Sequence, residues 1–574
     1  FVVGLFIVHA AIGLALEQRR GLLRTLRACG VSARMLIGCL IFELGVLALI
    51  GGVFGVISGY WLASVLLPDV AASLRGLYGA EVAGQLRLSP WWWFSGIGLS
   101  LLGALLAGAN SLLRAARLPL LAVADPQAWH EQYTRWLRRQ GWLALVLGVI
   151  ALVALLWGDS LASGFVLMAG LLIGAALALP VLLSGVLNQL LGRSRSVLGQ
   201  WFLADCRQQL PALSLALMAL LLALAANIGA GSMTAGFRQT FDDWLEQRLS
   251  AELYINPSNP AQAREMSTWL KQQPLVTAVL PNWQVAVTLQ GWPADVYGVI
   301  DHPYYRQHWP LLDASGGDPW AHLATDDAVM LSEQLARRLQ VRAGDRLAIP
   351  APNGAWSPRI VGIYADYGNP KGHLLVNSNH LLRGWPQLTP NRFNLRIDPQ
   401  NIAPFLSALQ ARFQLDDSRI VDQARLKGWS VEVFERTFAA TAALNTLTLA
   451  VAGVALFISL LTQSQSRLGQ LAPLWALGVT RRQLMLLNLG QTWLLAVLTL
   501  VLALPLGIAL AWCLDAVINV QAFGWRLPLR VFPWQLLQLM GLALLATLLA
   551  SAWPLYSLYR TQPADLLRTF AHED

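Results

Sequence analysis

The stretch RRGLLRTLRACGVSARML (19–36) decides the architecture, because its pattern returns without a gap as RLGQLAPLWALGVTRRQL (467–484). Nine of the eighteen positions are identical at this offset of 448 residues. About two matches are expected by chance in a chain rich in leucine and alanine. Five of the nine are Arg, Gly or Val, so leucine richness does not explain them. The repeat indicates that the chain contains two related units.

The composition is that of an integral membrane protein. Of 574 residues, 56% are hydrophobic and 13% charged, whereas a soluble domain carries about 25% charged residues. The net charge of +9 comes mostly from arginines in short loops, which is typical of cytoplasmic loops rather than of a nucleic-acid-binding surface. The four cysteines lie in or beside apolar segments, and their spacing predicts neither a disulfide framework nor a metal site.

Nine apolar segments approach or exceed the roughly 20 residues that cross a bilayer. They are 1–16, 35–67, 92–113, 141–157, 161–191, 210–233, 439–461, 484–518 and 532–558. The first is short and starts inside an apolar run, so we interpret the chain as truncated at its N-terminus. We expect a missing first span and a first outer domain upstream of it.

The arginines predict the orientation. They concentrate in 17–34, 114–140, 192–208, 462–483 and the C-terminal tail. With nine spans all five segments fall on one side, which the positive-inside rule makes cytoplasmic. The block 237–438 then lies outside the membrane. Its short strands and helices follow the order βαββ…βαβ, which predicts an α/β sandwich with a β-rich insertion. Helical stalks, 239–249 and 426–438, are expected to join it to the spans.

The chain resembles the FtsX-like permeases of the ABC transporter superfamily, of the two-unit, ten-span YbbP type related to MacB and the LolC/LolE pair. The carriers of the resemblance are the repeated basic segment, the terminal Arg-x-x-Pro at 560–563, and the outer stretch VMLSEQLARRL (329–339) followed by Gly344-Asp345. The resemblance implies an all-α membrane part with one extracytoplasmic α+β domain of the MacB-like periplasmic type.

The resemblance also divides the chain. It gives a first FtsX-like transmembrane unit at 1–118, a linker with two connecting helices at 119–208, and a leading span at 209–236. A periplasmic α+β domain with its stalks at 237–438 and a second FtsX-like unit at 439–574 follow. The chain is expected in the bacterial inner membrane, crossing it several times, with the large domain in the periplasm.

The two basic segments are interpreted as coupling helices that touch a cytoplasmic partner. Arg and apolar residues alternate at helical spacing, which gives one face for lipid headgroups and one for a partner. The alternative is an interfacial helix that only anchors the topology; two copies favour docking. The residues assigned to ATPase coupling are Arg19, Arg24, Arg27, Gly30, Val31, Arg34, Arg467, Gly478, Val479, Arg481 and Arg482. Gly30 and Gly478 are expected to end the short helices.

The partner implied by the resemblance is a cytoplasmic ABC ATPase dimer, because the sequence contains no Walker A loop. Its only lysines are Lys271, Lys371 and Lys427, and none follows a glycine. We therefore predict no enzymatic activity, catalytic residue, cofactor site or metal site in this chain, and ATP and Mg²⁺ on the partner subunit. Glu43 and its repeat mate Gln491 lie inside spans; interhelical hydrogen bonding is favoured over a proton relay.

The resemblance implies a permease that couples ATP hydrolysis to a change in the periplasmic domain, a mechanism called mechanotransmission. The substrate would be a lipid-like molecule, a lipoprotein or a polypeptide that is extracted or exported, with membrane lipid and a periplasmic lipoprotein or hydrolase as further partners. The alternative is a signal transducer that regulates a periplasmic hydrolase or another partner and transports nothing. A secondary transporter is a third alternative, disfavoured by the few charged groups in the spans.

Overall fold

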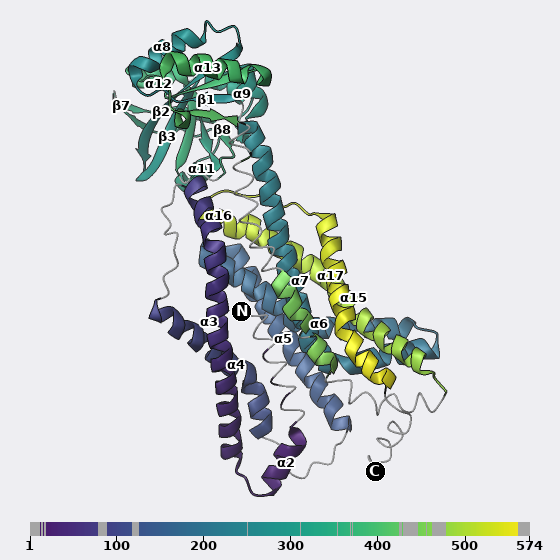
Figure 1. Cartoon of the computed structure of the whole chain (residues 1–574). Helices are drawn as coiled ribbons and strands as arrows, with labels where there is room; N and C mark the ends of the chain where they lie inside the picture. Colours follow the sequence, from purple (N-terminus) through teal and green to yellow (C-terminus); the bar gives the residue numbers. More distant parts are fainter. Residues whose placement is uncertain are drawn as a thin grey trace.

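The computed structural model describes residues 19–78, 89–116, 126–248, 251–423, 446–461 and 478–560, apart from single positions inside these ranges, together with Val8, Ile12, Ala15 and Gly428. A bundle of long helices forms one end of the molecule, and a compact α+β domain lies at the other end (Figure 1). The predicted fold class is confirmed.

Seven helices in the described ranges are long and apolar enough to cross a membrane. They lie within α3 (Ala33–Tyr78), α4 (Pro90–Ala116), α5 (Pro126–Trp157), α6 (Leu161–Arg193), α7 (Val197–Arg248), α15 (Arg481–Cys513) with its continuation, and α17 (Pro533–Arg560). Each corresponds to a predicted span. The predicted span 439–461 appears as a shorter apolar helix, Thr446–Leu461, and 1–16 lies outside the described residues except for three positions.

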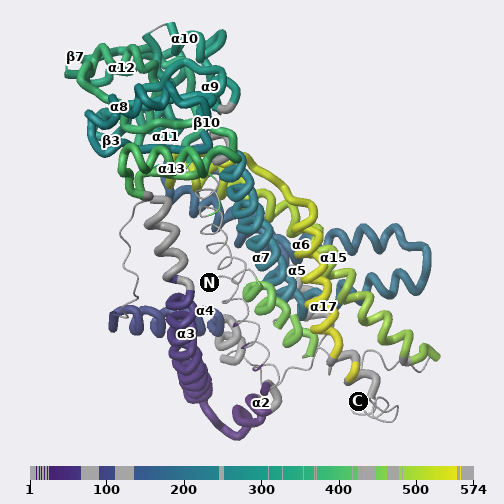
Figure 2. Tube along the Cα trace, turned by 45° about the horizontal axis from the view of Figure 1, so that its top comes forward, coloured from purple at the N-terminus to yellow at the C-terminus, as the bar shows by residue number. Residues whose placement is uncertain are grey.

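The membrane helices form two groups (Figures 1 and 2). Helices α3 and α4 pack mainly against each other, and Ser100 of α4 donates a hydrogen bond of 2.9 Å to the Ala48 carbonyl of α3. Helices α5, α6, α7, α15 and α17 form the second group. Its core is made of leucine and alanine, among them Leu183, Leu217 and Ala503. Close packing of such side chains drives helix association where lipid tails are equally apolar.

Helix α7 is one continuous helix of 52 residues. The sequence predicted a cytoplasmic loop over 192–208 and a span starting at 210, which is wrong: helix α6 ends at Arg193 and α7 begins at Val197. The residues from Val197 to Leu210 include many helix formers, and Pro211 does not end the helix. At 1.5 Å per residue α7 is about 78 Å long, more than twice the roughly 30 Å of a bilayer core. It therefore extends into the outer domain, as predicted for 239–249.

The outer domain is built on one mixed sheet of nine strands in the order β11-β1-β10-β2-β3-β9-β5-β8-β4. The strands are β1 (Leu253–Ile255), β2 (Val276–Leu289), β3 (Trp292–Val299), β4 (Leu311–Ala314), β5 (Ala328–Ser332), β8 (Arg359–Tyr364), β9 (Gly372–Asn377), β10 (Arg392–Ile397) and β11 (Ile420–Asp422). Strands β6 (Ile349–Ala351) and β7 (Gly354–Trp356) form a separate hairpin. Gln290 and Gly291, both with positive φ, make the two-residue turn between β2 and β3.

Helices cover both faces of this sheet. Helices α8 (Pro260–Leu270) and α13 (Ile402–Phe413) pack on β1 and β10, and α11 (Glu333–Leu339) and α12 (Ser378–Gly384) pack on the central strands. Helices α9 (Pro303–His308) and α10 (Pro319–Thr325) cover the opposite face. Short 3-10 turns span Pro399–Asn401 and Asp417–Arg419.

The predicted β-rich insertion is wrong, because its strands join the first and last units in the single sheet. The strand predicted over 345–349 is also misplaced: β6 begins at Ile349, and Arg346 makes only an isolated bridge. The predicted stalk 426–438 lies outside the described residues, Gly428 excepted. The other elements predicted for this domain are found within a few residues of their expected bounds.

Glycine packing between α7 and α15 gives a testable prediction. A Cβ added at Gly507 of α15 would lie 2.5 Å from the Ile228 Cβ of α7, whereas nothing lies within 4 Å of a Cβ at Gly55 of α3. Overpacking costs about 1–3 kcal/mol, so Gly507→Ala should lower the melting temperature of the detergent-solubilised protein. The matched variant Gly55→Ala should leave it unchanged or raise it, because alanine favours a helix interior. Equal melting temperatures for the two variants would contradict tight α7–α15 packing.

Candidate coupling site

The first basic segment folds as helix α2 (Arg20–Ala28), which stops at a glycine turn. Gly30 has φ +94°, a left-handed conformation that only glycine adopts without strain. Val31 N–H donates to the Leu26 carbonyl and Gly30 N–H donates to the Arg27 carbonyl, both at 3.1 Å. This pair of hydrogen bonds is a Schellman motif, which satisfies carbonyls at the end of the helix. The predicted role of Gly30 as helix terminator is confirmed.

The next helix starts immediately after this turn. The Ser32 hydroxyl accepts from Met35 N–H at 3.3 Å, so Ser32 is the N-cap of α3. The second copy has the same construction: Gly478 also has φ +94°. Thr480, the repeat mate of Ser32, caps α15 and forms a capping box with Gln483. Both segments therefore turn the chain into a long apolar helix by a left-handed glycine and a hydroxyl cap.

Sequence comparison by identity missed these caps, because Ser32 and Thr480 are not the same residue. Their shared chemistry is the signal: a Ser or Thr two positions after a helix-ending Gly predicts a new helix start. Leu36 and its mate Leu484 are both buried, on the first turn of α3 and α15. The repeat thus fixes a turn at the ends of the membrane helices as well as a charge pattern.

The predicted arginines occupy different environments. Arg19 forms an ion pair with Glu43 of α3 at 2.7 Å, and both side chains are about half exposed, at 51% and 46%. Arg27 lies in the last turn of α2, half-buried. Arg34 and Arg482, at matching positions after the two turns, are both exposed, and Val31 and Val479 are both half-buried.

Three of the assigned arginines are described less fully. Arg24 lies in α2 and Arg481 at the start of α15, and neither side chain is described. Arg467 lies outside the described residues. The structure therefore brings Gly30, Val31 and Arg34 together at one turn, and Gly478, Val479 and Arg482 at the other.

A buried polar network lies near the second turn. Gln491 of α15 is fully buried; its side-chain amide donates to the Asp205 carboxylate of α7 at 2.8 Å and its oxygen accepts from Gln209 at 2.8 Å. Gln491 is the repeat mate of Glu43, so the interhelical hydrogen bonding expected at this position is found. Asp205 and Gln209 were not predicted, because no repeat marks them. The network joins α7 and α15 at their cytoplasmic ends.

Comparison with known families matches these parts separately. The model described as FtsX-like permease C-terminal matches residues 1–120 and 442–563, which contain the two turns. The model described as MacB-like periplasmic core domain matches residues 213–415. The chain belongs to the FtsX-like permeases. It is an ABC transporter permease of the MacB/FtsX type, with its α+β domain in the periplasm and a cytoplasmic ATPase as the implied partner.

Known relatives of the permease are distant. An uncharacterized ABC transporter permease protein of Mycobacterium tuberculosis is 26% identical over 587 aligned positions, which cover 97% of this chain and 67% of that protein. The crystal structure of the periplasmic region of MacB from Actinobacillus actinomycetemcomitans aligns with 31% of this chain and 93% of its own, at 12% identity and TM-score 0.24. The extracellular domain of the noncanonic ABC-type transporter YknZ from Gram-positive bacteria aligns with 30% and 98%, at 16% identity and TM-score 0.23.

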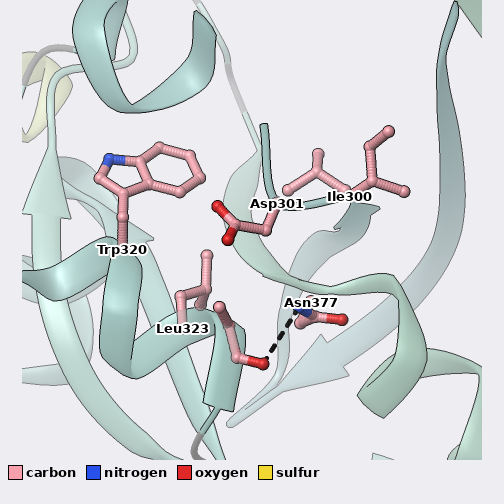
Figure 3. A pocket seen from close by; sticks show the side chains of 7 residues that line it. Ile300, Asp301, Trp320, Leu323 and Asn377 are labelled. Atoms are coloured by element: carbon pink, nitrogen blue, oxygen red, sulfur yellow. Dashed lines mark hydrogen bonds between the residues drawn. The ribbon is translucent and has the colours of Figure 1, made fainter. Parts of the chain in front are cut away.

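The periplasmic domain of the permease was also searched for a reactive site. Asp301, Trp320, Leu323 and Asn377 surround a small depression of about 160 Å³ (Figure 3). Arg306 binds the Asp301 carboxylate at 2.8 and 2.9 Å, and this hydrogen bonding lowers the pKa of Asp301. The carboxylate is thus engaged in a structural ion pair. Among the described residues, no group of three or more His, Cys, Asp or Glu side chains is placed to hold a metal ion.

The glycine turns give a second prediction. At φ +94° an alanine costs about 1–2 kcal/mol, so Gly30→Ala should loosen the end of α2. Hydrogen exchange of the amides of Cys29, Gly30 and Val31 in the full permease should become about tenfold faster. Gly38→Ala is the control, because Gly38 is helical and nothing lies within 4 Å of its added Cβ. Unchanged exchange in Gly30→Ala would show that the turn does not depend on glycine.

Proposed function

We propose that the chain is the permease subunit of a bacterial inner-membrane ABC transporter that works by mechanotransmission. A separate cytoplasmic ATPase would dock on the two basic turns, and ATP-driven closure of the ATPase would move α15 and α7, which carry the motion to the periplasmic domain. The single observation that supports this most strongly is the continuity of α7, which runs as one helix from the cytoplasmic side of the bundle to the domain (Figure 1).

The path starts at the second turn. Helix α15 begins directly after Gly478 and Thr480, so a force on the turn acts on the end of α15. Helices α15 and α7 are joined by Gln491 and Asp205 at one end and by the close approach of Gly507 to Ile228 further out. A close-packed interface of this kind transmits displacement instead of absorbing it. Motion of α15 should therefore move α7 along most of its length.

The docking surface is cationic. Arg34 and Arg482 are exposed after their turns, in positions related by the repeat, which suits a partner with two similar docking grooves. The chain contributes no Walker A loop, so hydrolysis, ATP and Mg²⁺ are assigned to the ATPase. The permease itself is proposed to have no enzymatic activity.

The proposed substrate is apolar or carries an apolar anchor: a lipid-like molecule, a lipoprotein or a polypeptide. The periplasmic domain sits over the outer ends of the spans (Figure 2), where such a substrate leaves the membrane. The small size of the Figure 3 depression supports a role for the whole domain as a moving part, rather than for one binding pocket.

The docking assignment is tested by charge reversal. The double variant Arg34→Glu, Arg482→Glu should lose stimulation of the copurified ATPase, because carboxylates replace both exposed cations. Arg264→Glu is the matched control, since Arg264 is exposed on α8 of the periplasmic domain, and its ATPase stimulation should equal the wild type. Full stimulation by a double variant that is folded and still inserted in the membrane would refute docking at these turns.

Cysteine labelling of cells tests the location. A membrane-impermeant maleimide should label the native, exposed Cys29 only after the inner membrane is permeabilised. A cysteine at Ser407, exposed on α13, should react as soon as the reagent reaches the periplasm. The Ser407→Cys variant would carry serine at the four native cysteines. Labelling of Cys29 from the periplasm would reverse the topology and remove the proposed function.

A further inference from the structure

The periplasmic domain touches the membrane part at a second place besides α7. Helix α15 continues through a π-helical turn (Leu514–Ile518) into α16 (Asn519–Phe523). A loop, 524–532, then leads to α17. In Figure 2 this yellow loop runs along the base of the domain. The loop meets the start of α11, which belongs to the Ser-Glu-Gln stretch that carries part of the family resemblance.

Polar contacts hold the two parts together. Arg526 N–H donates to the Glu333 carboxylate at 3.3 Å, while the other Glu333 oxygen accepts from Arg337. The Gln334 amide donates to the carbonyls of Asn369 and Lys371, both at 2.7 Å, and so fixes the loop between β8 and β9. A Cβ built at Gly524 would lie 3.3 Å from the Gln334 Cβ. The backbones of α11 and the outer loop are therefore in direct contact.

An aromatic cluster closes the contact. Trp525 is only 5% exposed; its ring lies 5.6 Å from Phe237 of α7 and 5.2 Å from Tyr367 of the domain. The Trp244 indole of α7 donates to the Ala365 carbonyl at 3.1 Å. One buried tryptophan thus touches both the helix that enters the domain and the domain itself. Aromatic pairs of this kind add about 0.5–1.5 kcal/mol each beyond their burial.

The contact is tied to α15 from below and to α7 from the side. The Asn519 amide of α16 donates to the Trp525 carbonyl at 2.7 Å, and Gly524 turns the chain with φ +79°. Arg530 of the loop forms an ion pair of 2.9 Å with Asp243 of α7. Burial, and then the nearby Glu333, raises the pKa of Tyr367 to about 12. The tyrosine therefore stays neutral at physiological pH.

We infer that this contact, the outer latch, is a second mechanical link between the membrane part and the periplasmic domain. It consists of Glu333, Gln334 and Tyr367 from the domain, Gly524, Trp525 and Arg526 from the loop, and Trp244 and Phe237 from α7. The inference rests on the proposed function. Motion of α15 reaches the domain through the 524–532 loop as well as through α7, so the domain turns with α15 and does not swing freely on its stalk.

Distance measurement between spin labels tests the latch in the full permease with its copurified ATPase. Labels at Ser407→Cys in the domain and Asp159→Cys in the α5–α6 turn, with serine at the four native cysteines, should change distance when ATP is added. Trp525→Ala should reduce this change to less than half and leave ATPase stimulation unaltered. Trp534→Ala is the matched control, because Trp534 is 70% exposed at the start of α17, and it should keep the full change.

The outcomes separate the two proposals. A wild-type distance that does not respond to ATP contradicts the proposed function and the latch with it. A wild-type response that survives intact in Trp525→Ala contradicts the latch alone. Loss of both the response and the ATPase stimulation in Trp525→Ala also contradicts the latch, because it places Trp525 in the general stability of the permease.

A reversible cross-link guards against simple misfolding. The 3.3 Å separation at Gln334 and Gly524 is close to the 3.5–4.5 Å between Cβ atoms of a disulfide. Gln334→Cys with Gly524→Cys, added to Trp525→Ala in the serine background, should restore the ATP-dependent distance change when oxidised and lose it when reduced. A cysteine at Gly524 is strained in both redox forms, so their comparison isolates the cross-link. Equal responses in the two forms would overturn the latch.

Discussion

The packing of α7 against α15 is the interaction on which the rest of the permease depends. Small residues let the two backbones approach, and a buried Gln491–Asp205–Gln209 network fixes their cytoplasmic ends. Because the interior of a helix pair is close-packed, the two helices have one preferred register. The turn before α15 and the domain after α7 are therefore parts of a single rigid assembly. The repeat places the turns; this interface gives them mechanical reach.

The two units of the chain share a turn but not an environment. Gly30 and Gly478 have the same φ of +94°, and Ser32 and Thr480 both cap the following helix. Further along, Glu43 is half exposed and paired with Arg19, whereas its mate Gln491 is fully buried. Gly507 is buried against α7, and its mate Gly59 is exposed. The second unit is thus the one that is packed tightly to the periplasmic domain in this structure.

Sequence reasoning predicted the membrane spans and most outer strands because their signals are local. Apolar length marks a span, and alternation of side chains marks a strand such as β2 or β8. It missed the joining of α7 into one helix, because Pro211 and nearby polar residues resemble a loop. It also missed the order of the nine strands and the environment of Trp525, since both depend on residues far apart in the chain. Interfacial tryptophans are common in membrane proteins, and Trp525 carries no mark that separates it from them.

The register of β1 has a consequence for how the periplasmic domain relates to the rest of the polypeptide. Leu253, where the chain enters the sheet, is directly opposite Asp422, where it leaves, so entry and exit are about 5 Å apart. A module whose two ends meet in this way behaves as a cassette inserted into its host. It can be exchanged for a homologous or unrelated cassette without forcing the flanking membrane segments apart, which gives evolution a simple route to new cargo on an unchanged engine mount.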